Sequence, residues 1–329
     1  MNIKFITCEE SILGKYFPTK TEPDLIPHEL PFTPDDELAV NALRDLGVNV
    51  KAVIWGEKNI QELKSSHLLV MRSPWDYTNT NEIRLSFIDW LTYLKGNQIK
   101  TENNIDFMLW LINKQYLKDL EKESIPIVPT EIINQHQKIS LEEVFANRGP
   151  FILKPCYGAA GKGLQFIDSK NKAIESNPKF QELIDKESYL LQPFIPEIKS
   201  NGEWSLVFLD GNYSHAIHKK TGDNSILVQA EHGGSLNFIE PQDRLIKHAG
   251  EMYPKILQAF RAKYKGYESY IPLYLRCDFI ETKNQYLLSE CEGVEPELFF
   301  RVKPDSAKSF AKSIIDRVDS NAKLITYSK

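Results

Sequence analysis

The sequence predicts a mixed α/β and α+β protein with more than one lobe, and three observations lead to this prediction. The chain has 329 residues, which is enough for two to three compact lobes, because domains of about 100 to 150 residues are the commonest. Its composition, 42% hydrophobic and 26% charged, is typical of globular proteins. Strand and helix patterns alternate through the first hundred residues, whereas strand follows strand later in the chain.

Residues 1–105 are expected to form a small parallel α/β layer. Short apolar strands are predicted at 3–7, 48–55 and 67–71, and amphipathic helices at 35–46 and 81–94. Each helix pattern stops close to a glycine, Gly47 and Gly96, as helix ends commonly do. The resulting order, β-α-β-β-α, is typical of a sheet whose strands run parallel.

The middle of the chain predicts a β-loop-β-α-β unit. A helix at 106–122 carrying Lys114 comes first, then an extended connector at 125–130 with two prolines, and a helix at 140–146. Strands follow at 151–155, 164–168 and 189–195, with a helix at 173–184 between the last two. A glycine-rich loop joins the first two strands, so this unit differs from a dinucleotide-binding unit, in which the glycines open a helix.

The remaining residues predict paired strands and two helices. Strands are expected at 203–211, 212–220, 226–230, 274–282 and 285–293, and helices at 243–264 and 303–318.

Charge and cysteine content exclude several classes of protein. Lys and Arg number 40 against 45 Asp and Glu, a net charge of −5, and no basic run with interleaved aromatics is found, so nucleic acid is not expected as a partner. No stretch of about 18 apolar residues and no leader pattern at MNIKFITCEE occur, so no membrane partner and a cytoplasmic location are expected. The four cysteines form no CxxC pair, which argues against zinc and a disulfide framework.

The loop after the strand 151–155 contains Gly158, Gly161 and Gly163 around Lys162. It is not a Walker A loop, because Gly163 rather than Ser or Thr follows Lys162, and it is not a dinucleotide fingerprint, because it opens onto a strand. One interpretation is a hairpin whose backbone N–H groups approach phosphate oxygens, with Lys154 pointing in from the strand. The other is an ordinary glycine-rich turn.

The strands 274–282 and 285–293 predict a hairpin turning around Asn284. Since side chains alternate along a strand, Asp278 should lie opposite Glu290, and Arg276 opposite Glu292, on one face. Three carboxylates gathered there are costly unless a cation neutralises them, and hard oxygen ligands suit Mg²⁺. The alternative is a group of solvated charges on an exposed sheet face.

Together these segments resemble the ATP-grasp superfamily. The similarity covers residues 106–300 in the order ILKP, GAAGKG, LLQPFI, GEWSLVFLDGNYSHAIHK, YLRCDF and LLSECEGVEPELFF, and RSPWDY is similar to the segment before the ATP-binding lobes. Within it, the chain is most similar to the glutathione-synthetase-like branch and to small ligases such as the O-ureido-serine cyclo-ligase. The resemblance implies a pre-ATP-grasp domain at 1–105, a small lobe at 106–195 and a C-terminal lobe at 196–329, with the nucleotide between the lobes.

The resemblance also implies roles for individual residues. ATP and Mg²⁺, as two ions, are the expected cofactors. For ATP, the phosphates would contact Lys114 and Lys154 under the loop of Gly158, Gly161 and Gly163, adenine would contact Gln192, Phe194 and Ile195, and ribose would bind to Glu203. Mg²⁺ would be bound by Asp278, Glu290 and Glu292. The catalytic residues would be Arg276 and Lys219. Leu227 stands where relatives often have a basic residue, so Lys219 or Lys220 is expected to do that work, or the substrate differs.

Substrate contacts are expected after the strand 67–71, at the carboxyl edge of an open α/β sheet. An arginine there would hold a carboxylate and an acidic residue an amine, and a glycine loop further on would close over the acceptor. The residues are Arg72, Ser73, Trp75, Asp76 and Tyr77, with His232, Gly233 and Gly234 in the loop. The alternatives are a packed proline turn and a plain turn. His215 and His218, three apart on a strand, are expected to be structural.

The activity implied is that of an ATP-dependent ligase joining a small carboxylate and an amine through an acylphosphate, with release of ADP and phosphate. Separate molecules and ring closure both remain open, and dimers are common in the family, so a homodimer is an expectation too. A kinase on the same scaffold and a non-catalytic nucleotide-binding module are the rival hypotheses. The acidic hairpin with Arg276 argues against the last, because binding alone does not require the arginine.

Overall fold

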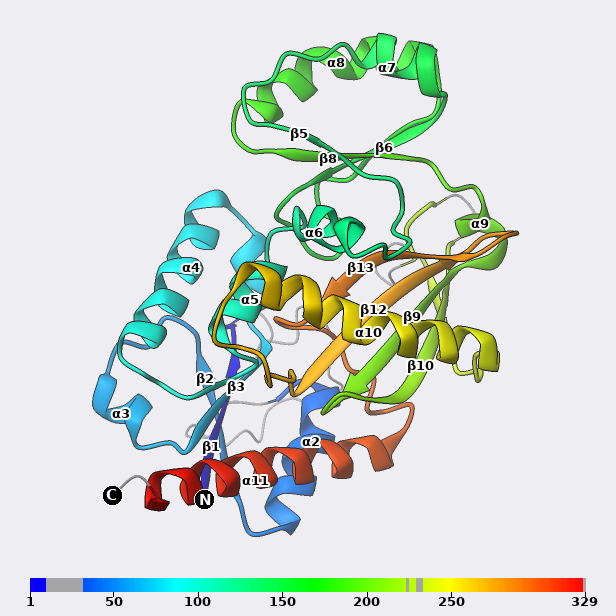
Figure 1. Ribbon diagram of the computed structural model, residues 1–329. Coiled ribbons are helices and arrows are strands. Elements are labelled where there is room, and N and C mark those ends of the chain that lie inside the picture. The colour runs from blue at the N-terminus through cyan, green and yellow to red at the C-terminus, as the bar shows by residue number, and fades with distance from the viewer. Residues whose placement is uncertain (10–31, 223–224, 229–232, 328–329) are drawn as a thin grey trace, which may run out of the picture.

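The computed structural model describes residues 1–9, 32–222, 225–228 and 233–327. In the N-terminal part, β1 (Asn2–Thr7), β2 (Asn49–Ile54), β3 (Leu68–Ser73) and β4 (Thr101–Glu102) form a parallel sheet in the order β2-β1-β3-β4 (Figure 1). Alternation along β1 sends Ile3 and Phe5 to the core beside α2 (Pro34–Asp45) and Ile6 to the core beside α3 (Ile60–Lys64) and α4 (Asn81–Gly96). The predicted parallel layer is confirmed.

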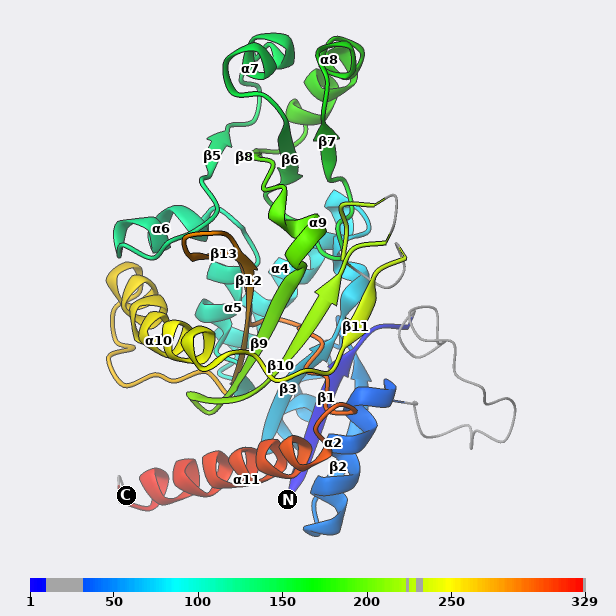
Figure 2. The same cartoon turned by 90° about the vertical axis from the view of Figure 1, so that its right-hand side faces the viewer.

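A small lobe projects from the rest of the molecule (Figures 1 and 2). Its antiparallel sheet has the order β5 (Glu131–Ile133), β8 (Tyr189–Pro193), β6 (Phe151–Pro155) and β7 (Gln165–Ile167). Helices α7 (Leu141–Arg148) and α8 (Lys170–Ile184) cover its outer face, and the lobe has a core of its own, which includes Phe151, Leu153 and Phe180. The glycine-rich loop connects the paired strands β6 and β7, as the sequence predicts.

The C-terminal sheet is antiparallel, in the order β11 (Ser235–Asn237), β10 (Asn212–Lys220), β9 (Glu203–Leu209), β12 (Tyr274–Glu281) and β13 (Tyr286–Glu292). Leu206 and Cys277 on one face pack in the same core as Met252 and Phe260 of α10 (Asp243–Lys263). Because side chains alternate, the opposite face presents the polar residues of the same strands toward the small lobe. These are Glu203, Ser205, Arg276 and Asp278.

The N-terminal layer and the C-terminal sheet share their cores. Ile3 and Phe5 of β1 cluster with Val207 of β9 and with Phe310 of α11 (Pro304–Tyr327), which packs along α2 at the bottom of Figure 1. Helices α5 (Ile105–Leu111) and α6 (Tyr116–Lys122) contribute to the core that contains α10. The described part from about 131 to 193 therefore has a core cluster of its own, although Leu190 of β8 packs in the main core.

Several local predictions were wrong. The helix expected at 106–122 is broken into α5 and α6, because Asn113 Oδ1 accepts the N–H of Gln115 and the N–H of Lys114 is bonded to the carbonyl of Cys156. Lys114 therefore lies in the break. The strand expected at 226–230 is not formed at 226–228, its last two residues lie outside the described part, and β11 pairs with β10 instead. The elements α3, α9 (Glu197–Asn201), β4, β5 and the 3₁₀ helix η1 (Trp75–Thr78) were not predicted.

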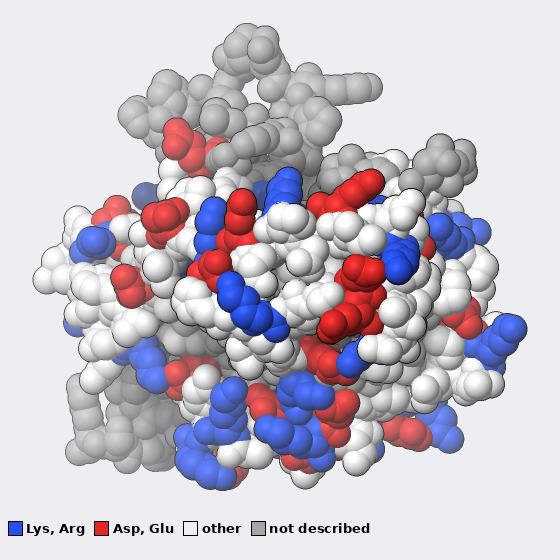
Figure 3. Space-filling model, turned by 90° about the horizontal axis from the view of Figure 1, so that it is seen from above, with Lys and Arg blue, Asp and Glu red and all other residues white. Residues whose placement is uncertain are grey.

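Among the described residues, none of the helices combines the length and the apolar character needed to cross a bilayer. Viewed from the small-lobe end, basic and acidic side chains alternate over the described surface rather than forming a stripe of one sign (Figure 3).

Candidate active site

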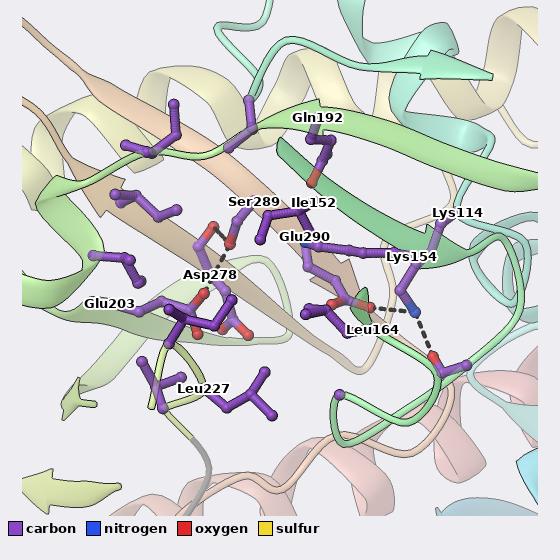
Figure 4. Close-up of a pocket in the computed structure, with 18 of the residues that line it drawn as sticks. Lys114, Ile152, Lys154, Leu164, Gln192, Glu203, Leu227, Asp278, Ser289 and Glu290 are labelled. Atoms are coloured by element: carbon purple, nitrogen blue, oxygen red, sulfur yellow. Dashed lines mark hydrogen bonds and ion pairs between the residues drawn. The ribbon is translucent and has the colours of Figure 1, made fainter. Parts of the chain in front are cut away.

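A pocket lies where β6, β8 and the glycine-rich loop face β12 and β13 (Figure 4). It brings together most of the residues predicted to contact ATP and metal, although they are up to 178 positions apart between Lys114 and Glu292. The predicted residues lining it are Lys114, Lys154, Gly158, Gly161, Gln192, Phe194, Ile195, Glu203, Arg276, Asp278, Glu290 and Glu292. Gly163 does not line the pocket but shapes the loop, and Lys219 lies behind it, bonded to pocket carboxylates.

One end of the pocket is apolar. Its walls include residues that sequence analysis missed, among them Val128, Ile152, Leu164, Ile198, Val228 and Ile280. Gln192 is buried at this end, and its Nε2 donates to Thr130 Oγ1 at 2.8 Å, while that hydroxyl donates to the Val128 carbonyl at 2.6 Å. The hydroxyl can only accept from Gln192, so the amide nitrogen is turned toward Thr130. Ile152 could have been predicted as a pocket residue, since alternation along the strand puts it on the same face as Lys154.

The two lysines at the other end differ in their partners. Lys114 Nζ lies 2.7 Å from Glu290 Oε1 and also donates to the Gly158 carbonyl (Figure 4). Burial lowers the pKa of Lys114, but the Glu290 carboxylate outweighs it and the net shift is upward. For Lys154 Nζ, no hydrogen bond or ion pair is found within the described residues, and burial lowers its pKa. Lys154 is thus a half-buried cation available to an anionic ligand.

The hairpin of β12 and β13 has the predicted register, with Asp278 opposite Glu290 and Arg276 opposite Glu292. Arg276 donates to Asp278 through Nε and Nη2, at 3.0 and 2.9 Å, and its Nη2 lies 2.6 Å from Glu292 Oε1. Lys219 Nζ lies 3.4 Å from Glu203 Oε1 and 3.5 Å from Asp278 Oδ2. Arginine and lysine side chains therefore neutralise carboxylates for which the sequence had predicted a metal cation.

The pKa values of these carboxylates diverge for physical reasons. Burial raises the pKa of Asp278, but Arg276 and Lys219 outweigh it and hold the value at about 2. Burial raises the pKa of Glu292 to about 7 despite the attraction of Arg276. It also raises the pKa of Glu203.

Nothing in the described part of the chain groups three or more His, Cys, Asp or Glu side chains as a ready metal site. Glu290 is engaged by Lys114, and Glu292 by Arg276. Their oxygens and those of Asp278 nevertheless border the pocket from adjacent positions of one hairpin, and the chemistry of this donor set fits Mg²⁺.

The predicted substrate residues at the end of β3 and in η1 are not brought into the pocket. Arg72 is buried, and its Nε lies 2.7 Å from Asp36 Oδ1 while Nη2 donates to the Pro296 carbonyl at 3.2 Å. Ser73 Oγ donates to Thr7 Oγ1, and Asp76 Oδ1 accepts from Trp55 Nε1 at 2.6 Å. The guanidinium of Arg72 is enclosed between the N-terminal layer and the C-terminal lobe, so the expectation that it holds a substrate carboxylate finds no support in this pocket.

Trp75 and Tyr77 of η1 both contact Glu295, three residues beyond Glu292. Trp75 Nε1 donates to the Glu295 carbonyl at 2.9 Å, and the Tyr77 hydroxyl donates to Oε1 at 2.8 Å. Burial, reinforced by Glu292, raises the pKa of Glu295 to about 8. Sequence analysis missed Glu295, because its only signal was its proximity to the acidic hairpin.

The remaining predicted residues have plainer positions. His232 lies outside the described residues, and Gly233 and Gly234 do not line the pocket. Leu227 does line it, while Lys219 rather than Lys220 reaches the pocket carboxylates. The rings of His215 and His218 are bonded through Nε2 to the carbonyls of Leu298 and Asn201, which gives them structural roles.

Two family models match the chain. Residues 5–103 match the N-terminal domain of D-cycloserine synthetase DcsG, and residues 117–259 match the ATP-grasp domain of prokaryotic glutathione synthetase. The cycloserine biosynthesis protein DcsG of Streptomyces lavendulae is 24% identical over 297 residues, covering 88% of this chain and 95% of that protein. A glutathione synthetase of Synechocystis is 26% identical over 93 residues, 28% of each chain.

Solved structures share the fold along the whole chain. The crystal structure of D-cycloserine synthetase DcsG superimposes with a TM-score of 0.77 at 20% identity, covering 97% of this chain and 100% of that one. The D-alanine–D-alanine ligase of Bacillus anthracis gives a TM-score of 0.63 at 13% identity with both chains fully covered.

Proposed function

Because the chain is an ATP-grasp protein, with the matched domain at residues 117–259, we propose that it is an ATP- and Mg²⁺-dependent ligase that joins a small carboxylate to an amine. The observation that carries the proposal is the pocket itself. It has an apolar end beside Gln192, and at its other end it has the cation Lys154, for which the described residues supply no partner, and the Arg276–Asp278–Glu290 group. A nucleoside triphosphate has matching parts: a largely apolar base, anionic phosphates and a reactive terminal phosphate.

The pocket supports one orientation of ATP. Adenine lies among the apolar walls, where Gln192 Oε1 is the side-chain atom left to accept a hydrogen bond from the adenine amino group. Ribose lies toward Glu203. The phosphates lie beneath Gly158 and Gly161, where Lys154 neutralises their charge.

Asp278, Glu290 and Glu292 are the residues that would hold Mg²⁺, which when bound supplies charge neutralisation and orientation of the phosphates. Before the reaction, Lys114 pairs with Glu290 and Arg276 pairs with Glu292, and these contacts fix the carboxylates in the hairpin. Lys219 fixes Asp278 and Glu203 from behind.

The proposed reaction has two steps. An oxygen of the substrate carboxylate attacks the γ-phosphorus of ATP and ADP leaves, which gives an acylphosphate. An amine nitrogen then attacks the acyl carbon, and phosphate leaves with the oxygen that the carboxylate contributed. Phosphoryl transfer depends on positioning and charge neutralisation, so Lys154, Lys114 and Arg276 suffice without a nucleophilic side chain.

Small amino-acid-like molecules are the proposed substrates. The relatives are named for D-cycloserine synthesis, glutathione synthesis and D-alanine ligation, and all three names refer to amino acids or compounds derived from them. The proposal includes both the joining of two molecules and the closure of a ring within one.

The test is release of ADP and phosphate from ATP and Mg²⁺ in the presence of amino acids, offered singly and in pairs, with mass spectrometry of the products. We expect carboxylate-dependent release and a product lighter by one water than the sum of its parts. Glu290→Gln should lower the rate by about a hundredfold or more, because it removes a carboxylate from the proposed metal site. Glu281→Gln, on the same hairpin but bonded to Arg244, is the matched control. A stable phosphorylated product without an amine requirement would establish a kinase instead.

A further inference from the structure

The glycine-rich loop is held at two points by residues of the N-terminal layer. Tyr157 directly precedes Gly158, and the guanidinium carbon of Arg84, on α4, lies 4.3 Å from the centre of the Tyr157 ring. Within the loop, Lys162 Nζ donates to Asn79 Oδ1 at 2.6 Å. Asn79 is the residue that ends η1.

The contact of Arg84 is reinforced from two sides. Arg84 Nη1 lies 3.0 Å from Glu187 Oε2, and the two side chains are only 11% and 18% exposed. The Tyr157 hydroxyl accepts from Asn113 Nδ2 at 3.0 Å, immediately before Lys114. Partly buried cation–π contacts and ion pairs are stronger than exposed ones, so this end of the loop is firmly attached.

The loop has little structure of its own to hold it. Within it, the described backbone hydrogen bonds are two turns, from Lys162 N–H to the Ala159 carbonyl and from Leu164 N–H to the Gly161 carbonyl. Gly161 and Gly163 have positive φ angles of 70° and 74°, and glycine loses the most conformational freedom on ordering. Contacts from outside the loop therefore determine how often it lies over the pocket.

We propose that Arg84 and Asn79 are positioning residues that hold the glycine-rich loop closed over the nucleotide phosphates. The inference rests on the proposed function, since that function places phosphates beneath the loop. It has a second consequence, because η1 also carries Trp75 and Tyr77, which bond to Glu295 just beyond the acidic hairpin. One short segment thus contacts the loop on one side of the phosphate end and Glu295 on the other.

The test is hydrogen exchange of the loop amides, residues 158–164, in the full-length protein without ligand. We expect Arg84→Ala to speed their exchange by about fivefold or more, because loss of a partly buried cation–π contact favours local opening. Arg84→Lys should give an intermediate rate, since a lysine can keep the ion pair with Glu187 but not the planar stacking. Asn79→Ala, at an exposed position where folding is not at risk, should act in the same direction. Arg148→Ala removes an exposed ion pair of the same lobe with Glu131 and is the matched control.

A second readout is the Kd of a non-hydrolysable ATP analogue, AMP-PNP with Mg²⁺, measured by calorimetry. We expect Arg84→Ala to raise this Kd about three- to tenfold, because the closed loop becomes rarer, while Arg148→Ala leaves it unchanged. Loop exchange in Arg84→Ala and Asn79→Ala equal to that of the unaltered protein would overturn the inference even if nucleotide binding is normal. Lack of AMP-PNP binding by the unaltered protein would instead contradict the proposed function, while the exchange measurement would still decide the attachment of the loop.

Discussion

At the scale of single residues, the pocket shows how the chain assigns different tasks to chemically similar groups. Lys114 is neutralised by Glu290 and bonded to the loop backbone, whereas Lys154, 40 positions later, has neither kind of partner in the described residues. Burial lowers the pKa of Lys154, so the lysine gains most when an anion enters. In the proposed function, Lys114 would therefore hold Glu290 and the loop before ATP binds, and Lys154 would neutralise the phosphates.

His215 makes the stability of the fold depend on pH. It is buried in β10, and burial lowers its pKa from 6.5 to about 4. The unfolded chain takes up the proton first as pH falls, so stability that is complete above pH 6.5 is lost progressively down to about pH 4. The loss from this one group is on the order of 3 kcal/mol.

We therefore expect His215→Gln to flatten the decrease in the free energy of unfolding between pH 6.5 and 4, measured by urea titration. His136→Gln, with a side chain that is 71% exposed, is the control and should retain the steeper decrease. An identical pH dependence for His215→Gln and the unaltered protein would show that His215 does not contribute to the loss of stability at low pH.

At the scale of elements, Gly163 sets the shape of the β6–β7 loop. Its φ is +74°, and a Cβ added there would lie 2.8 Å from Pro155 Cγ. We expect Gly163→Ala to displace the loop and raise the Kd of AMP-PNP by about tenfold, since both backbone strain and a steric clash oppose the bound geometry.

Gly149 provides the matched control for this substitution. Its φ of +72° is also unfavourable for alanine, but a Cβ there meets nothing within 4 Å. Gly149→Ala should lower the free energy of unfolding by about 1–3 kcal/mol without changing nucleotide affinity. Equal effects of the two variants on Kd would mean that the clash with Pro155 is unimportant.

The elements that the sequence predicted best are those fixed by alternation. The pairing of Asp278 with Glu290 and of Arg276 with Glu292 agrees with the two-residue period of a strand. The turn itself, closed between Thr282 and Gln285, sets the register one residue away from that pairing, and a β-bulge between Asp278 and Phe279 corrects it, which the sequence did not predict. The break at Lys114 was not predictable from periodicity, since it depends on a bond to the Cys156 carbonyl 42 positions away. The burial of Arg72 and the contacts of Glu295 were not predictable for the same reason: their partners come from distant parts of the chain.

At the scale of the whole molecule, the N-terminal layer is joined to the C-terminal lobe by a buried arginine, Arg72, which forms an ion pair within its own layer and contacts the lobe with the rest of its guanidinium. Arg72 lies between Asp36 and the Pro296 carbonyl, and its guanidinium carbon is 5.2 Å from the centre of the Tyr274 ring. The side chains of Arg72 and Asp36 are only 2% and 3% exposed. Removal of the arginine leaves a buried carboxylate without its partner.

We expect Arg72→Ala to lower the free energy of unfolding by about 3–5 kcal/mol, measured by urea titration, because an uncompensated buried charge is strongly destabilising. Arg148→Ala, which breaks an exposed pair, should cost about 1 kcal/mol or less. A variant of unchanged stability that had lost only substrate affinity would return Arg72 to the substrate site.

In the whole molecule, the small lobe has its own core but its glycine-rich loop is attached to the main body. Its core is its own, yet Tyr157 and Lys162 in its loop contact Arg84 and Asn79 of the main body. The pocket lies at this junction, so ATP bound as proposed would contact both parts at once.

The acylphosphate is the central claim, and transfer of an oxygen isotope tests it most directly. The protein is supplied with ATP, Mg²⁺ and amino acids whose carboxylates carry ¹⁸O, and the released phosphate is analysed by mass spectrometry. The account predicts one ¹⁸O atom in each phosphate formed with product, because the carboxylate oxygen that attacks the γ-phosphorus leaves with it. Product formation accompanied by unlabelled phosphate would contradict carboxylate activation by ATP.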